Sequence, residues 1–215
     1  KGVAVVCHGL CSWRNQILIE SLSRGLAGSG RKLASLRFDF QGNGSSGGEW
    51  GYDFSESREV DDVEAAIRYV ETELQKPVVV LVGHSQGSKT ILNWFSKTKR
   101  NADLIPRVMV SISGRFFPNA SPNGRFKPEQ IEELETTGKF LWFVRGRECW
   151  VDKEAMERRA AMDMVKVTER INAKKGGTMF VLIHGSADET VPVEDGEELS
   201  RRIDGAQYTR IEGAS

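Results

Sequence analysis

The residues best suited to covalent chemistry are a serine between two glycines, in Gly83-His84-Ser85-Gln86-Gly87. A β-branched run at 77–82 precedes them, and residues that can form a helix follow. Such a strand–turn–helix context exposes a serine hydroxyl as a nucleophile, and the two glycines remove side chains that would collide with neighbouring backbone. The pattern predicts that Ser85 is a nucleophile. The alternative is a serine that only begins a helix after a buried strand.

A second match to the same pattern, Gly44-Ser45-Ser46-Gly47-Gly48, lacks this context. No apolar run leads into Ser46, and no helical pattern follows it. We therefore expect Ser46 to lie in a loop, because clusters of glycine and serine between periodic segments are typical of loops.

A serine that attacks a carbonyl group needs two backbone N–H groups to bind the oxyanion. Gln86 follows Ser85 at the start of a predicted helix, where partial positive charge favours an anion. The second N–H is expected from the loop after the first strand, at His8-Gly9-Leu10, which makes Leu10 the candidate. Gly9 allows this backbone to approach a substrate closely.

The candidate acid lies much later in the chain. Where a serine sits on such a turn, the acid follows it in the sequence and a histidine comes last. Asp188 comes just after the strand-like run 178–183, so it is expected at the same edge of the sheet as Ser85. Glu189 and Asp195 are weaker candidates because they lie further from the strand end. The alternative role of Asp188 is to stabilise a turn.

No histidine occupies the expected place of the general base. The chain has three histidines, and none of them follows Asp188. His8 lies in the predicted oxyanion loop, and His184 precedes the acid. The side chain of His84 should point away from the hydroxyl of Ser85.

Strand-like and helical segments alternate along the chain, which predicts an α/β fold with a doubly wound, mostly parallel sheet. Strand-like runs cover 3–7, 33–40, 77–82, 104–113, 178–183 and 207–211, and helical spacing covers 15–26, 60–74 and 194–203. Ligands of such sheets bind at the C-terminal ends of the strands, where both Leu10 and Ser85 are expected.

The segment 115–177 interrupts this alternation with many charged and aromatic residues. Residues 129–136 and 152–171 have helical patterns. We expect the segment to be an inserted helical cap over the site, with 1–114 and 178–215 as the core domain. Its aromatic side chains either line a substrate pocket or pack the cap onto the core.

Composition limits the possible partners. The 30 basic and 30 acidic residues balance, which argues against nucleic acid or an anionic membrane as the main partner. No apolar run is long enough to span a membrane. Three scattered cysteines favour a reducing, cytoplasmic setting over a disulfide framework. Cys7 and Cys11 have the spacing of half a metal site, but no second pair exists, so no metal or cofactor is expected.

Five segments together resemble the α/β-hydrolase superfamily, and within it the branch of cinnamoyl/feruloyl esterases and serine aminopeptidases. These segments are 7–10, 37–46, 83–87, 113–116 and 184–192, and they occur in the family's order. The resemblance implies the α/β-hydrolase fold and a serine hydrolase that cleaves carboxylic esters through an acyl-enzyme. The balanced charge and the aromatic segment point to an uncharged or apolar small-molecule substrate. Nothing in the sequence indicates the oligomeric state.

The resemblance also implies a place for the missing base. In this family a run similar to Glu212-Gly213-Ala214-Ser215 is followed at once by the catalytic histidine, so the base is expected just after Ser215. Compared with the family, the chain also lacks the first antiparallel strands and the final helix.

Two other functions remain open on the sequence alone. The missing histidine is compatible with a non-catalytic protein of the same fold that binds a small ligand. A peptidase or a thioesterase with the same triad is the other alternative, because these enzymes share acyl-transfer chemistry. Haloalkane dehalogenase chemistry is disfavoured, since its nucleophile is a carboxylate and position 85 is serine.

Overall fold

A parallel sheet forms the centre of the molecule in the computed structural model, which describes residues 2–30, 32–52, 58–117, 125–174 and 176–215. Within these residues the sheet has six strands in the order β2-β1-β3-β4-β7-β8, and every neighbouring pair is parallel. The strands are β1 (Val3–Cys7), β2 (Ala34–Arg37), β3 (Val78–His84), β4 (Val108–Ile112), β7 (Met179–Gly185) and β8 (Gln207–Ile211). The expected doubly wound, mostly parallel sheet is confirmed.

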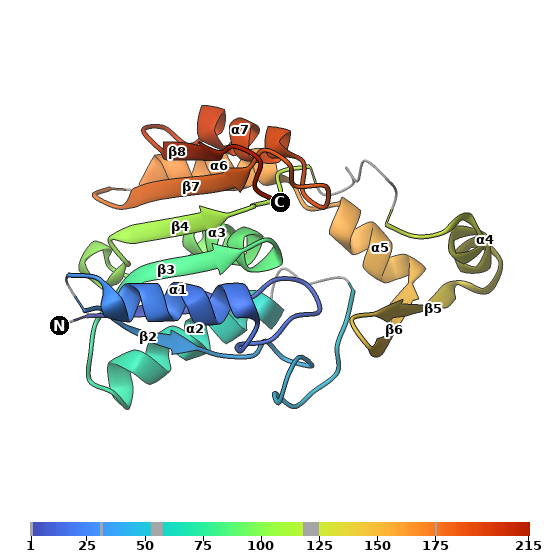
Figure 1. Ribbon diagram of the computed structural model, residues 1–215, viewed down its shortest axis with the longest axis horizontal. Helices are drawn as coiled ribbons and strands as arrows, with labels where there is room; N and C mark the ends of the chain where they lie inside the picture. The colour runs from blue at the N-terminus through green and yellow to red at the C-terminus, as the bar shows by residue number, and fades with distance from the viewer. Residues whose placement is uncertain (1, 31, 53–57, 118–124, 175) are drawn as a thin grey trace.

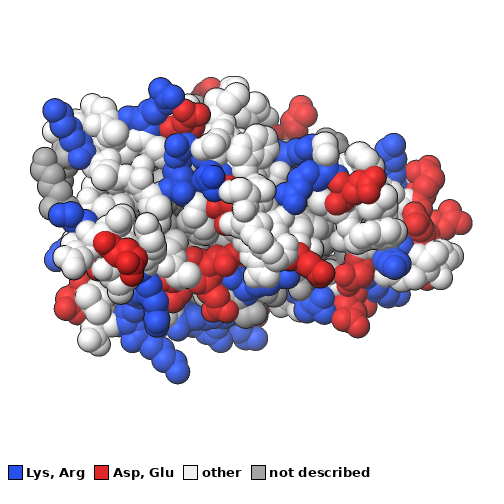
Figure 2. Space-filling view, turned by 90° about the horizontal axis from the view of Figure 1, so that it is seen from below, with Lys and Arg blue, Asp and Glu red and all other residues white. Residues whose placement is uncertain are grey.

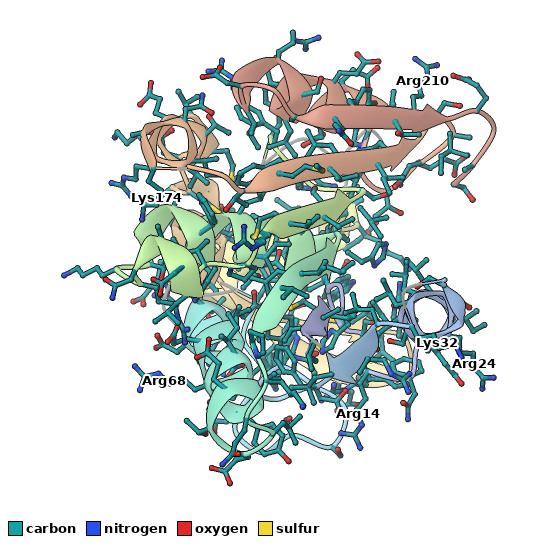
Figure 3. The ribbon with its side chains drawn as sticks, turned by 90° about the vertical axis from the view of Figure 1, so that its left-hand side faces the viewer. Arg14, Arg24, Lys32, Arg68, Lys174 and Arg210 are labelled. Atoms are coloured by element: carbon teal, nitrogen blue, oxygen red, sulfur yellow. The ribbon has the colours of Figure 1, made fainter. Side chains whose placement is uncertain are left out.

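Helices cover both faces of this sheet (Figure 3). They are α1 (Ile17–Gly28), α2 (Arg58–Thr72), α3 (Gln86–Lys97), α6 (Met164–Lys174) and α7 (Val193–Arg202). Val6 and Val82 are buried with Ile19 of α1 on one face. Val5 and Leu81, their neighbours in sequence, belong to the larger core formed with α2, α3, α6 and α7. Adjacent residues face opposite helices because side chains alternate along a strand.

The C-terminal ends of the parallel strands point toward a smaller projecting part of the chain (Figure 1). This part contains α4 (Pro128–Thr137), β5 (Lys139–Val144), β6 (Arg147–Asp152) and α5 (Lys153–Ala160). The antiparallel pair β5–β6 turns at Arg145 and Gly146, which both have positive φ angles, of 51° and 75°. Two such residues are typical of a tight hairpin turn. The helix predicted at 129–136 is confirmed as α4, whereas no strand was predicted at the hairpin.

Helix α6 falls inside the segment 115–177 but packs with the core. Val167 and Ile171 are buried among the residues of the main hydrophobic cluster. The predicted helix 152–171 is divided into α5 and α6 by a break at 161–163. We therefore propose that the cap comprises the projecting part that ends with α5, and that α6 is a helix of the core.

Charged side chains of both signs are interspersed over the face shown in Figure 2, in keeping with the equal totals of 30 basic and 30 acidic residues. Among the residues that the structure describes, no helix is both long enough and apolar enough to cross a bilayer.

Candidate active site

Ser85 lies on a sharp turn between β3 and α3, with φ 51° and ψ −112°. Its N–H donates a hydrogen bond of 2.8 Å to the carbonyl oxygen of Ile112 on the neighbouring strand. A Cβ atom on Gly83 would lie 2.4 Å from the carbonyl oxygen of Gly87, and one on Gly87 would lie 2.5 Å from that of His8. Both contacts are with backbone, so this strained turn requires glycine at the two positions.

Ser85 opens into a cavity of about 550 Å³ at the C-terminal edge of the sheet. The cavity lining brings together Leu10, Gln86 and Asp188 with Ser85, the four site residues that the sequence suggested. Gln86 is the first residue of α3, where a backbone N–H has no partner within the helix. Gly9 brings the loop after β1 close to the turn, since a Cβ atom there would lie 3.3 Å from Cβ of Ser85.

The carboxylate of Asp188 is held by the backbone of its own loop. Its Oδ1 accepts hydrogen bonds from the N–H groups of Thr190, at 2.9 Å, and Val191, at 2.8 Å. Its Oδ2 lies 3.9 Å from Nε2 of His184, and the side chain is 11% exposed. The carboxylate is thus fixed in place at the wall of the cavity.

The two weaker acid candidates have different surroundings. Asp195 is fully buried and accepts hydrogen bonds from the N–H groups of Phe116 and, at 2.7 Å, Phe117. It therefore anchors the loop after β4 and does not belong to the cavity lining given by the described residues. Glu189 lines the cavity and is exposed.

Two of the three histidines have structural hydrogen bonds. Nδ1 of His8 donates to the carbonyl oxygen of Gly9 at 2.8 Å, and its Nε2 accepts from the N–H of Phe40 at 3.1 Å. Nε2 of His184 donates to the carbonyl oxygen of Val191 at 2.9 Å. Both rings are buried, and burial lowers the pKa of His8. Neither ring is positioned as a base for Ser85.

His84 lines the cavity next to the turn, and burial lowers its pKa to about 4. Among the described residues, its buried Nδ1 has no hydrogen-bond partner. A histidine with so low a pKa is a weak proton acceptor, which agrees with the expectation that His84 is not the base.

The end of the chain also borders the cavity. Ala214 and Ser215 are part of its lining. The carbonyl oxygen of Ala214 accepts a hydrogen bond of 2.8 Å from the N–H of Ala187, and the N–H of Gly213 donates to Oγ of Ser186 at 2.8 Å. These hydrogen bonds connect Gly213 and Ala214 to the loop that contains Asp188.

The second glycine–serine motif has a different environment. Oγ of Ser46 donates to the carbonyl oxygen of Asp39 at 2.6 Å. The buried carboxylate of Asp39 accepts from the N–H and Nη1 of Arg14, at 2.6 and 2.8 Å, and from the N–H of Ser45 at 3.0 Å. Ser46 thus lies in a loop that is organised around Asp39, as expected.

Cys7 and Cys11 lie in different surroundings. Cys7 is buried within β1, whereas the thiol of Cys11 is hydrogen-bonded to that of Cys149 on β6. Among the described residues, no cluster of three or more His, Cys, Asp and Glu side chains is suited to a metal ion.

Comparison with protein families gives the decisive match. A family model described as "serine aminopeptidase, S33" matches residues 1–214. The chain belongs to this family of α/β-hydrolases. A search of curated protein sequences gave no match.

Solved structures share the fold of this S33 hydrolase. Est1E from Butyrivibrio proteoclasticus with bound ferulic acid has a TM-score of 0.77 at 18% identity, over 99% of this chain and 80% of that chain. An esterase domain from Rhodothermus marinus has a TM-score of 0.64 at 19% identity, over 99% and 77% of the two chains. Mouse α/β-hydrolase domain-containing protein 10 has a TM-score of 0.68 at 18% identity, over 100% and 82%.

The segment 115–177 contains seven aromatic residues, and of these Trp142 alone lines the cavity of this S33 hydrolase. Phe126 and Phe140 belong to a hydrophobic cluster with Tyr52, which lies outside the projecting part. Phe143 and Trp150 are exposed. Most of these side chains therefore do not line the pocket.

Among the cavity residues that the sequence did not suggest are four arginines. They are Arg115, Arg125, Arg145 and Arg159. Arg115 directly follows the end of β4 in a loop at the ligand-binding edge, which is a signal that sequence reasoning had available. Arg159 follows another arginine on a charged helix and resembles a solvent-facing residue, so only the fold reveals its position.

Two ionisable side chains, Glu59 and Lys89, influence each other behind the turn. The carboxylate of Glu59 accepts hydrogen bonds from Nε2 of Gln86 at 2.9 Å and from Oγ1 of Thr90 at 2.8 Å. Lys89 is 2% exposed, and burial, followed by repulsion from Arg159, lowers its pKa to about 7. Burial raises the pKa of Glu59. This pair was not predicted from the sequence.

Proposed function

We propose that the protein is a serine hydrolase that cleaves carboxylic esters. The observation that supports this most strongly is the strained turn at Ser85, whose φ of 51° is maintained by backbone contacts around Gly83 and Gly87. Strained backbone in a cavity at a sheet edge is a frequent property of catalytic residues. In the proposal Ser85 is the nucleophile and Asp188 the acid.

A histidine just after Ser215 is proposed as the base. This histidine takes the proton of the Ser85 hydroxyl while Oγ attacks the ester carbonyl carbon, and Asp188 stabilises the imidazolium. The N–H groups of Leu10 and Gln86 bind the oxyanion. The alcohol leaves with the proton from the imidazolium. Water then attacks the acyl-enzyme, gives its proton to the histidine and releases the carboxylic acid, and the proton returns to Ser85.

The contacts of residues 213–215 support this place for the base. The hydrogen bond between Ala187 and Ala214 keeps the end of the chain beside the Asp188 loop, and Ser215 already lines the cavity. A residue that follows Ser215 would therefore begin beside Asp188 and Ser85.

A substrate panel tests the proposal. The full-length protein is assayed with a short-chain ester of 4-methylumbelliferone, a matched thioester and an aminoacyl anilide. We expect the ester to have the highest kcat/KM and Ser85→Ala to lower kcat by about 10⁴–10⁶. Ser46→Ala, the matched control from the second motif, should keep kcat within about threefold. Ester turnover that survives Ser85→Ala would overturn the proposal.

The description of the family favours one second candidate, an aminopeptidase. Such an enzyme must bind a protonated amino terminus, which requires acidic groups near the nucleophile. The described residues that line the cavity include two acidic residues, Asp188 and Glu189, against four arginines. We therefore prefer the esterase, and faster cleavage of the aminoacyl anilide than of the ester would reverse this choice.

A further inference from the structure

A side-chain hydrogen bond joins the residue after Ser85 to a neighbouring helix. Nε2 of Gln86, the first residue of α3, donates to Oε2 of Glu59 on α2 at 2.9 Å. The two residues are 27 positions apart in the sequence, and α2 packs beside α3 (Figure 3). Glu59 therefore reaches the turn at Ser85 from a separate element of the fold.

Thr90 connects the same carboxylate oxygen to the backbone of Gln86. The hydroxyl of Thr90 lies 2.8 Å from Oε2 of Glu59 and 3.0 Å from the carbonyl oxygen of Gln86, and it is oriented to donate to either oxygen. Gln86 is thus held at its side-chain amide and at its carbonyl group. Gln86 is 6% exposed, so water has little access to compete for these hydrogen bonds.

These contacts restrain the peptide group between Ser85 and Gln86 from both sides. On one side, the N–H of Ser85 donates to the carbonyl oxygen of Ile112 at 2.8 Å. On the other side, Gln86 is bound to Glu59. The N–H of the first residue of a helix has no partner within the helix, so no hydrogen bond of this kind fixes its direction. The strained φ of 51° at Ser85 persists only where surrounding contacts maintain it, and Glu59 supplies one of them.

A second hydrogen bond between α2 and α3 provides a comparison. The carboxylate of Glu64, further along α2, accepts from Nε1 of Trp94 on α3 at 2.9 Å. Trp94 lies about two helical turns along α3 from Gln86. Both glutamates join the same two helices, but Glu59 does so at the turn that contains Ser85.

We propose that Glu59 is a positioning residue for ester hydrolysis, because it holds Gln86 so that the N–H of Gln86 is directed at the oxyanion formed when Ser85 attacks. This inference rests on the proposed function. Donors to an oxyanion act through positions that are fixed before the reaction begins, and a small misplacement removes much of their effect. Glu59 is not among the described residues that line the cavity, so it acts through Gln86.

Steady-state kinetics of the full-length Glu59→Ala protein test the proposal. We expect kcat for a 4-methylumbelliferyl ester to fall about 10–100-fold and KM to change less than about threefold, because the lost contact affects the transition state more than the bound ester. Glu59→Gln should restore kcat to within about threefold of wild type, since one amide oxygen can accept both hydrogen bonds. Glu64→Ala, the matched control, should keep kcat within about threefold.

Gln86→Leu removes the side-chain amide and keeps the backbone N–H. This variant remains informative if Glu59→Ala does not fold, and we expect a similar fall in kcat. The double variant should be slower than the slower single variant by no more than about threefold, because both single changes remove the same hydrogen bond.

An inhibitor that forms an oxyanion distinguishes positioning from a merely structural role. In 1,1,1-trifluoro-2-octanone, Oγ of Ser85 bonds to the carbonyl carbon, the C=O π electrons move to the oxygen, and the hydroxyl proton passes to the histidine proposed after Ser215. The Ki of this ketone should rise in Glu59→Ala by about the factor lost in kcat. The Ki of 2-octanone, which binds without this bond, should change less than about threefold, and Glu64→Ala should leave both values within threefold.

Three results would overturn the positioning role: an unchanged kcat in both Glu59→Ala and Gln86→Leu, an equal loss in Glu64→Ala, or a Glu59→Gln protein as slow as Glu59→Ala. The last result would assign the effect to the charge of Glu59 instead of its hydrogen bonds. The wild-type protein separates these failures from that of the proposed function. Wild type that hydrolyses no ester contradicts the esterase and the role of Glu59 with it, whereas ester turnover that the variants do not change contradicts only the role of Glu59.

Discussion

Around Ser85, at the floor of the cavity, backbone atoms are packed closely. Three arginines with long cationic side chains, Arg115, Arg125 and Arg159, also line the cavity, and we call them the arginine wall. At the floor, Gly83 and Gly87 face backbone oxygens at distances that leave no room for a side chain. At the wall, Arg115 and Arg159 are close enough to repel each other. The floor has the geometry that the proposed reaction requires, whereas the wall holds like charges close together.

Disrupting the backbone packing around Gly83 should have the largest effect on stability and activity. In Gly83→Ala the new Cβ atom would lie 2.4 Å from the carbonyl oxygen of Gly87, and backbone cannot move aside easily. We expect a loss of about 3 kcal/mol in the free energy of unfolding, together with loss of activity. The control is Gly25→Ala inside α1, where nothing lies within 4 Å of the new atom. It should stabilise the protein by about 0.5–1 kcal/mol. Urea unfolding measures both, and similar changes in both variants would contradict the account.

The second prediction compares the stability effects of replacing two arginines, Arg100 and Arg159. Burial alone would lower the pKa of Arg100, but its hydrogen bonds to Glu64 and Glu71 outweigh burial and raise it. Arg100→Met should therefore cost about 2 kcal/mol of stability. In Arg159, burial and repulsion from Arg125 and Arg115 lower the pKa to about 10, so removing this charge in Arg159→Met should cost less than about 1 kcal/mol. Chemical denaturation of both variants at pH 7 tests this, and a larger loss in Arg159→Met than in Arg100→Met would contradict it.

A pH-dependent effect concerns Lys89, whose pKa of about 7 in the folded protein lies below its ordinary value of 10.5. Below pH 7 the lysine is charged in both states, and the folded protein bears the full cost of burying it. Between pH 7 and 10.5 the unfolded chain binds more protons than the folded one, so stability rises with pH. Lys89→Met lacks this contribution. Urea unfolding should show that wild type gains stability relative to Lys89→Met as pH rises from 7 to 10. A difference in stability between wild type and Lys89→Met that stays constant with pH would contradict the lowered pKa of Lys89.

The floor could be predicted from the sequence because its chemistry is local. The apolar run, Gly83, Ser85 and Gly87 are neighbours in the chain, and the alternation of strands and helices places Leu10 at the same sheet edge. The position of Asp188 after Ser85 in the chain identifies the candidate acid. Each of these signals depends on spacing along the sequence.

The wall could not be predicted because its parts are distant in sequence. Arg115 and Arg159 are brought together by the hairpin β5–β6 and by α5, and the hairpin itself was missed because its residues looked like an aromatic stretch of a helical cap. Overall charge, with 30 residues of each sign, hides a local concentration of cations. The composition pointed to an apolar substrate for this reason.

The most direct test of the account is whether Ser85 is a nucleophile. The full-length protein is treated with a fluorophosphonate probe, digested and examined by peptide mass spectrometry. The account predicts one adduct, on Ser85, which is absent from Ser85→Ala and retained in Ser46→Ala. No adduct, or an adduct that persists in Ser85→Ala, would contradict it.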